Sequence, residues 1–380
     1  MIDDLQDRLA KSSVAFRGYN VTNLGRTLEL LRHGVYRPTM HRYLTEASAI
    51  CSEAMGRQVD LISRVEREEE TSLATYDEAV AMIVAVELAQ VKLLREHFGV
   101  DLRKAKVMYG YSLGEITALC VGGLTAMKDA LQIPLALCRD CAELADDVAM
   151  GVVFSRGDAI DQNAVNRLCV RINGEGRGVI GTSSILSPNS LLMLGQGDTI
   201  ARFKDAAREA IGKDIHVRKN PHTWPPLHTP IMWQRHIPNR SAVLMQTLPS
   251  EMHRPRPPII SMVTGRQSYN DYNWREIIHR WIDHPQRVWD VVYQTLSLGI
   301  ETVIHVGPQP NLIPATFRRL AENVQAQTSG VGGLGARAVA GMARRLWLAK
   351  LLPKRAALLR AASLQLVVLE DWLLEHEPTE

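Results

Sequence analysis

Residues 107–115 read VMYGYSLGE, and they decide how the rest of the chain is interpreted. The first three residues have the apolar character of a buried strand end, and an apolar helical pattern begins at Glu115. Residues 110–114 match G-x-S-x-G, the sharp turn that exposes a serine between a strand and a helix. The glycines leave space beside the hydroxyl, and the amides of the following helix point toward it. This context favours Ser112 as a nucleophile over an ordinary Gly/Ser turn.

Length and composition are those of a globular chain with more than one lobe. The 380 residues are 46% hydrophobic, and 44 basic against 41 acidic side chains give a net charge of +3. So small and evenly mixed a charge argues against nucleic-acid binding. The acidic-polar start has no apolar core of a signal peptide, and no uncharged run reaches the roughly 18 residues that span a bilayer. We expect a cytoplasmic protein with no membrane partner.

The five cysteines are odd in number and lie mostly among apolar neighbours, which predicts reduced core residues. Cys138 and Cys141 have C-x-x-C spacing. Neither a second pair nor a histidine cluster accompanies them, so we expect no metal site.

The order of predicted elements indicates an α/β fold. The sequence predicts a short strand at 13–16, a long buried helix from Thr75 to Gly99, the strand that ends at the Ser112 turn, and further helices. This order predicts a sheet with helices on both faces. Residues 148–218 change to a β-α-β-β-α-β pattern, which predicts an inserted ferredoxin-like subdomain. The large domain, of α/β-hydrolase type, is then expected to comprise residues 13–147 and 219–323, including a strand at 259–263.

Residues 324–380 are predicted to form a Gly-rich linker followed by a helical C-terminal extension. Residues 325–335 are polar and rich in glycine, and a basic helical pattern follows at 336–352. Residues 330–335 fit G-x-G-x-x-G, but no apolar strand leads into them, so a dinucleotide-binding loop is not expected.

Several separated motifs resemble the acyltransferase family of malonyl-CoA:acyl carrier protein transacylases and polyketide synthase acyltransferase domains. They are GYSLGE at 110–115 (family G-H-S-x-G-E), LSPNSLLMLG at 186–195 (N-S-P-x-Q-x-V-x-S-G), LHTPIM at 227–232 (F-H-[ST]-P-x-M), VTG at 263–265 ([NV]-x-T-G) and VGP at 306–308 (E-x-G-P). Together they cover about four fifths of the chain, from Ser13 to Leu320, in the family's order.

The resemblance implies a serine acyl-enzyme mechanism. Ser112 would be the nucleophile and His228 its base, oriented by a main-chain carbonyl at the position of Trp281. The backbone N–H groups of Leu113 and Tyr19 would form the oxyanion hole.

The resemblance also implies the substrates. The family moves a malonyl or related acyl group from coenzyme A, a substrate and not a resident cofactor, to the phosphopantetheine thiol of an acyl carrier protein, in fatty acid and polyketide biosynthesis. Arg139 matches the family's carboxylate-binding arginine, since a guanidinium pairs well with a carboxylate. The alternative is an ion pair between Arg139 and Asp146 or Glu143.

Carrier proteins of this kind are typically acidic, so basic residues are candidates for the docking surface. These are Arg318, Arg319, Arg337, Arg344, Arg345 and Lys350. A solvated helix face is the alternative for the last four.

Three departures from the family pattern lie in the expected pocket wall: residues 16–20 read FRGYN where the family has F-P-G-Q-G, Tyr111 replaces a histidine, and Leu227 replaces an aromatic residue. These departures leave open which acyl group the family resemblance implies, and a branched acyl group is one of the alternatives.

Three alternatives to acyl transfer remain. An acyl-thioester hydrolase would use the same fold. A general α/β-hydrolase should place its histidine near the end of the fold, whereas two strand units follow His228. A non-catalytic scaffold is expected to have lost Ser112 or His228, and both are present.

Overall fold

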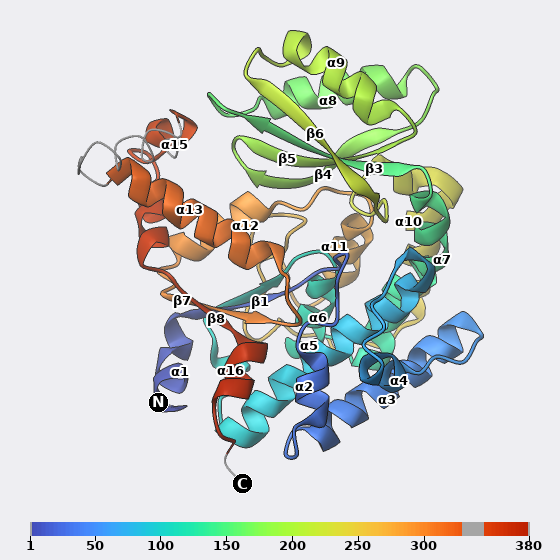
Figure 1. The fold of residues 1–380 in the computed structure, drawn as a ribbon, viewed down its shortest axis with the longest axis vertical. Coiled ribbons are helices and arrows are strands. Elements are labelled where there is room, and N and C mark those ends of the chain that lie inside the picture. The colour runs from blue at the N-terminus through green and yellow to red at the C-terminus, as the bar shows by residue number, and fades with distance from the viewer. Residues whose placement is uncertain (1, 329–345, 379–380) are drawn as a thin grey trace.

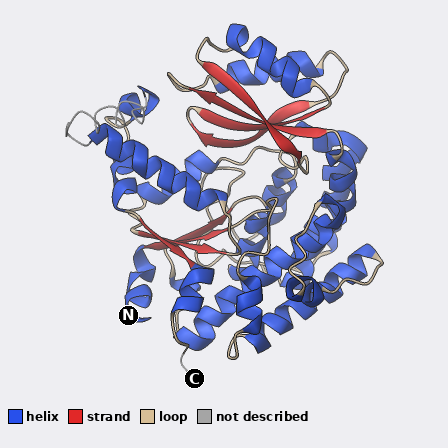
Figure 2. Cartoon of the chain, viewed as in Figure 1, coloured by secondary structure: helices blue, strands red, loops and turns tan. Residues whose placement is uncertain are grey.

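The computed structural model describes residues 2–328 and 346–378, which form two sheets with helices around them (Figure 1; Figure 2). The first sheet is parallel, with the order β2-β1-β7-β8. Its strands are β1 (Ser12–Phe16), β2 (Val107–Gly110), β7 (Thr302–Val306) and β8 (Gln365–Val368). All residues of β1, β2 and β7 are buried, as expected for a parallel sheet covered on both faces.

The register of this sheet brings three chain turns together at one edge. Phe16 lies opposite both Gly110 and Val306, and each is the last residue of its strand. The segments that follow these strands, including Ser112, therefore lie at the carboxyl edge, where open α/β sheets bind their ligands.

Helices cover both faces of the parallel sheet. The long helix α5 (Tyr76–Phe98) is buried along most of its length, because apolar residues occupy nearly its whole circumference. The other helices of this part are α1 (Ile2–Arg8), α2 (Thr27–Arg32), α3 (Arg37–Met55), α4 (Leu61–Glu66), α6 (Leu113–Val121), α7 (Met127–Ala145), α10 (Ile237–Thr247), α11 (Trp274–Trp281), α12 (Val288–Ser297), α13 (Leu312–Thr328), α15 (Leu346–Leu351) and α16 (Leu369–Glu375).

The second sheet is antiparallel, with the order β4-β5-β3-β6. Its elements are β3 (Val148–Ser155), α8 (Gln162–Asn173), β4 (Ile180–Ser187), β5 (Ser190–Gln196), α9 (Thr199–Ala210) and β6 (Ile215–Thr223). Both helices lie on the face turned away from the large domain (Figure 1). This is the predicted ferredoxin-like topology, and β6 runs past residue 218, the predicted end of the subdomain.

The C-terminal part differs from the predicted helical extension. Residues 365–368 form β8, which pairs in parallel with β7 and completes the large sheet, and α16 packs beside α2 and α5. Tyr36 donates a hydrogen bond to the Leu373 carbonyl at 2.8 Å, which ties α16 to the body of the domain. The predicted linker begins too early, because residues 325–328 are the end of helix α13 (Leu312–Thr328). The rest of the predicted linker and most of the basic helical pattern, residues 329–345, lie outside the described residues.

The strand predicted at 259–263 is not formed. Of the β2 residues, only Met108 pairs with this segment. Its N–H donates a hydrogen bond to the Pro258 carbonyl, and its carbonyl accepts one from the Ile260 N–H. The chain then turns back, and Ser261 bridges Arg266. The segment is apolar because it is buried under the elbow, so its composition resembles that of a strand.

Candidate active site

The turn at residues 110–114 has the strained backbone of a nucleophile elbow. Ser112 has φ 52° and ψ −117°, a conformation that an L-residue rarely adopts. A Cβ on Gly110 would lie 1.9 Å from the Gly114 carbonyl carbon, and one on Gly114 would lie 2.5 Å from the Phe16 carbonyl oxygen. Both positions therefore require glycine, and the turn is pressed against the end of β1.

The Ser112 hydroxyl lies 2.7 Å from Nε2 of His228, in the loop between β6 and a short 3-10 segment at Pro230–His236. The other ring nitrogen, Nδ1, lies 2.6 Å from the main-chain oxygen of Trp281. A carbonyl oxygen only accepts hydrogen bonds, so Nδ1 carries the proton and Nε2 offers its lone pair to the serine hydroxyl. This arrangement can remove a proton from Ser112.

Burial keeps the His228 ring neutral. The side chain is 3% exposed, and loss of solvation lowers its pKa from 6.5 to about 4, against the smaller opposing effect of the Trp281 carbonyl. A neutral imidazole is the form that accepts a proton, so the ring is ready to act as a base across the neutral pH range.

Trp281 contacts this pair from α11 in two ways. Its main-chain oxygen accepts a hydrogen bond from His228, as the family resemblance implies, and its indole Nε1 donates to the Ser112 carbonyl at 2.9 Å. The tryptophan side chain therefore holds the elbow while its backbone orients the ring.

Gln286 is a contact that sequence reasoning missed. Its buried amide oxygen accepts a hydrogen bond from the Ser112 N–H at 3.0 Å, and its amide nitrogen lies 3.2 Å from Nδ1 of His228. Its backbone bonds Ser183 and Ile185 of β4, at 2.8 Å each. Gln286 thus connects the elbow to the small subdomain, and nothing in its sequence neighbourhood signals this.

The two predicted oxyanion donors come from segments that meet at Ser112. Leu113 is the first residue of α6, and Tyr19 follows Gly18 in the turn after β1. A Cβ on Gly18 would lie 3.1 Å from the Ser112 Cβ, which shows how closely the turn approaches the elbow. The Arg17 side chain holds this turn, donating to the Gly18 carbonyl at 2.9 Å and to the Pro308 carbonyl at 2.7 Å.

A cavity of about 300 Å³ opens beside Ser112 and His228. Its lining consists of Tyr19, Asn20, Tyr76, Tyr111, Ser112, Met150, Ser183, Leu192, Leu194, Asn220, Trp224, Pro225, Leu227, His228 and Leu312. The wall is mostly aromatic and aliphatic, with two asparagines and two serines. Among the described residues, no arginine, lysine, aspartate or glutamate lines it.

Arg139 does not reach this cavity, so its assignment as the carboxylate ligand is wrong. Its side chain is 88% exposed and forms an ion pair with Glu143 at 3.2 Å, one of the two partners in the alternative. The neighbouring face of α7, with Leu135 and Cys138, is buried. Arg139 lies on the opposite, solvent side of the helix, because a rotation of one or two residues decides which side chain faces inward.

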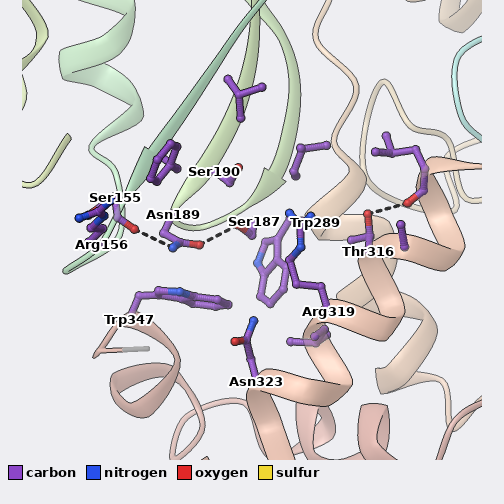
Figure 3. A pocket seen from close by; sticks show the side chains of 16 residues that line it. Ser155, Arg156, Ser187, Asn189, Ser190, Trp289, Thr316, Arg319, Asn323 and Trp347 are labelled. Atoms are coloured by element: carbon purple, nitrogen blue, oxygen red, sulfur yellow. Dashed lines mark hydrogen bonds between the residues drawn. The ribbon is translucent and has the colours of Figure 1, made fainter. Parts of the chain in front are cut away.

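A second cavity, of about 400 Å³, lies between the small subdomain and α13 and shares Leu312 with the first. Figure 3 shows Trp289, Trp347, Arg319 and Asn323 facing the turn between β4 and β5. The two indoles pack edge to face at 5.6 Å. Arg156 and Arg319, both exposed, give this cavity the positive charge that the first one lacks.

No group of metal ligands is found among residues 2–328 and 346–378. In the same ranges, no helix combines the length and hydropathy needed to cross a membrane. All five cysteines are free thiols, and Cys138 and Cys141 are buried in α7.

No family model matches the chain. Polyketide synthase GfsA of Streptomyces halstedii is 26% identical over 226 residues, 60% of this chain but only 3% of that much longer protein.

Solved structures are similar over most of the chain. FabD of Acinetobacter baumannii has a TM-score of 0.64 at 17% identity, covering 81% of this chain and 90% of its own. The acyltransferase domain from module 8 of the salinomycin polyketide synthase has a TM-score of 0.63 at 19% identity, with 81% and 67% covered. The malonyl-transacylase PlMCAT, solved with the acyl carrier protein AntF, has a TM-score of 0.61 at 19% identity, with 81% and 92% covered. The resemblance is therefore confirmed at the level of architecture: the chain has the two-subdomain fold of malonyl-CoA:acyl carrier protein transacylases and polyketide synthase acyltransferase domains.

Proposed function

We propose that this protein is an acyltransferase that moves an acyl group from a coenzyme A thioester to the thiol of an acyl carrier protein, through an ester on Ser112. The observation that carries the proposal is the 2.7 Å contact between the Ser112 hydroxyl and Nε2 of His228. The other ring nitrogen, Nδ1, donates its proton to the Trp281 carbonyl, which leaves Nε2 free to accept the serine proton. Nucleophile, base and orienting group are the parts that acyl transfer through a covalent intermediate requires.

The first half-reaction forms the acyl-enzyme. His228 Nε2 takes the Ser112 proton as Oγ bonds to the thioester carbonyl carbon, and the N–H groups of Leu113 and Tyr19 stabilise the oxyanion. The carbon–sulfur bond then breaks, and His228 returns the proton to the departing thiolate. In the second half, the carrier thiol gives its proton to His228 as its sulfur bonds to the ester carbonyl carbon. The bond from that carbon to Ser112 Oγ then breaks, and His228 returns the proton to Oγ.

The second cavity suits the phosphate-bearing part of both thioesters. Guanidinium groups bind phosphate oxygens well, and Arg156 and Arg319 lie at this cavity. Leu312 borders both cavities, so they are neighbours, and we place the pantetheine arm between Ser112 and these cations. The complex of PlMCAT with AntF supports a carrier protein as the acceptor. Of the other predicted docking residues, Lys350 forms an ion pair with Asp158 at 2.6 Å, and Arg337, Arg344 and Arg345 lie outside the described residues.

The test is a two-step labelling experiment. Acetyl-, propionyl- and malonyl-CoA are incubated singly with the protein, and intact-mass spectrometry reads the adduct; Ser112→Ala should show none. Adding a holo-carrier should then move the acyl mass to the carrier. An adduct that persists in Ser112→Ala would refute the nucleophile, and rapid loss to water without a carrier would indicate a thioester hydrolase instead.

A further inference from the structure

We infer that the acyl group carried by Ser112 has no free carboxylate: the cavity is built for an uncharged acyl chain rather than a malonyl-type one. This inference rests on the proposed function and specifies its substrate class. It comes from the side chains that meet at Ser112 and from where the cations of the neighbouring elements lie.

The cavity wall offers apolar contact on most sides. Tyr19 and Tyr76 pack edge to face at 4.9 Å, and Tyr19 packs in the same way against Trp224 at 6.4 Å. These rings and the aliphatic side chains from β3 and β5, Met150 and Leu194 among them, gain free energy when they bury an apolar chain. The polar groups of the wall are amides, hydroxyls, an indole N–H and the neutral imidazole of the catalytic histidine, none of which bears a charge.

Arg17, two residues before Tyr19 of the cavity wall, already has a full set of hydrogen-bond partners. It is fully buried and donates four hydrogen bonds, to the carbonyls of Gly18, Thr22 and Pro308 and to the amide oxygen of Asn23. These contacts hold the turn after β1, so rotating Arg17 toward a substrate would break them. Arg17 is therefore a structural cation.

In the part of the chain that the structure describes, no arginine or lysine lines the acyl cavity. A neighbouring cavity that shares Tyr76 with it is lined by Arg57 and Arg139, and each of these is paired with a carboxylate. Arg139 is directed to solvent on α7, and Arg235 pairs with Asp140 and Glu143 beside it. His228 supplies no charge, because its one ring proton is donated to Trp281 and its second nitrogen accepts from Ser112. A carboxylate entering this cavity would lose its hydration without gaining a partner of opposite charge, which is strongly unfavourable.

The deciding experiment is a competition. Equimolar acetyl-, propionyl-, butyryl- and malonyl-CoA are mixed with the full-length protein, the reaction is stopped early, and intact mass gives the share of each adduct. We expect each uncharged adduct to exceed the malonyl adduct by about tenfold or more, the factor that an unpaired charge easily supplies. A malonyl-dominated adduct overturns the inference alone, whereas no adduct with any thioester overturns the proposed function and the inference with it.

Two variants sharpen the result. Arg139→Ala should leave the malonyl share unchanged, because the side chain points away from the cavity; a fall in that share would contradict the inference.

Met150→Arg places a guanidinium on the cavity wall and should raise the malonyl share, with Met150→Gln as the uncharged control of similar length. An unaltered share in a Met150→Arg variant that retains the wild-type melting temperature counts against the inference, and the wild-type competition decides the matter if that variant does not fold.

Discussion

The main-chain oxygen of Trp281 lies 2.6 Å from Nδ1 of His228 and thereby determines which ring nitrogen is free for Ser112. In a serine triad a carboxylate usually holds the histidine, and its charge stabilises the imidazolium. Here a neutral carbonyl holds the histidine, without the negative charge of a carboxylate. Because the acceptor belongs to the backbone, a change of side chain at residue 281 leaves it in place.

Removing the base should slow the reaction without preventing the fold. His228→Ala is expected to reduce the rate of Ser112 acylation by about 10² to 10⁴, the usual contribution of a general base. Single-turnover mass measurements give this rate, and His222→Ala, at an exposed position in β6, is the control. An unchanged rate in His228→Ala would show that another group takes the proton.

The acylation rate should withstand mild acid. The pKa of His228 is lowered to about 4 by burial, and the neutral ring is the active base, so kcat/KM for acyl-CoA should stay level from about pH 8 to pH 5 and fall near pH 4. Initial rates across this range, with circular dichroism to verify folding, provide the measurement. A midpoint near pH 6.5 would mean that the ring is solvated in the free enzyme.

Gln286→Leu should weaken the turn that holds Ser112, although Gln286 is not one of the reacting groups. The substitution leaves the partly buried N–H of Ser112 without this acceptor, and an unsatisfied buried donor typically costs about 1–3 kcal/mol. We expect lower thermal stability and a lower acylation rate. Gln286→Glu keeps an oxygen acceptor and should restore part of the rate; equal rates for both variants would indicate that Gln286 only fills space.

Gly110→Ala should be strongly destabilising. The added methyl would overlap the Gly114 backbone at 1.9 Å, and relieving such overpacking costs about 3 kcal/mol. Urea unfolding measures the loss. Gly34→Ala is the matched control, since nothing lies within 4 Å of its added carbon, and its stability should change by less than about 0.5 kcal/mol.

Arg319→Ala and Arg156→Ala should weaken carrier binding more than chemistry. If these guanidinium groups hold the phosphate, KM for the holo-carrier should rise and its dependence on salt should weaken, while acyl loading at saturating acyl-CoA stays constant. Arg171→Ala, on the exposed side of α8, is the control. Unchanged KM in both cavity variants would exclude this surface from docking.

The sequence by itself determined the elbow, its serine and the histidine that meets it. Residues 110–114 are a local motif whose strand, turn and helix are contiguous, so their geometry follows from steric rules that act over a few residues. The alternation of strand and helix patterns likewise predicted the α/β fold and the inserted ferredoxin-like subdomain. His228 was reachable because the flanking residues of its loop match a known motif.

Tertiary structure decided what surrounds the serine. Gln286 contacts Ser112 from 174 positions along the chain, and no local pattern encodes such a pairing. Arg139 was misplaced because helical periodicity indicates that a face is buried but leaves the rotation uncertain by one or two residues, enough to move a guanidinium from cavity to solvent. The sequence predicts a helical extension where β8 forms, because four residues carry no distinctive period and only pairing with β7 makes them a strand. Local motifs therefore identified the reacting groups, whereas the charge and shape of the acyl cavity depend on side chains that only the folded chain brings together.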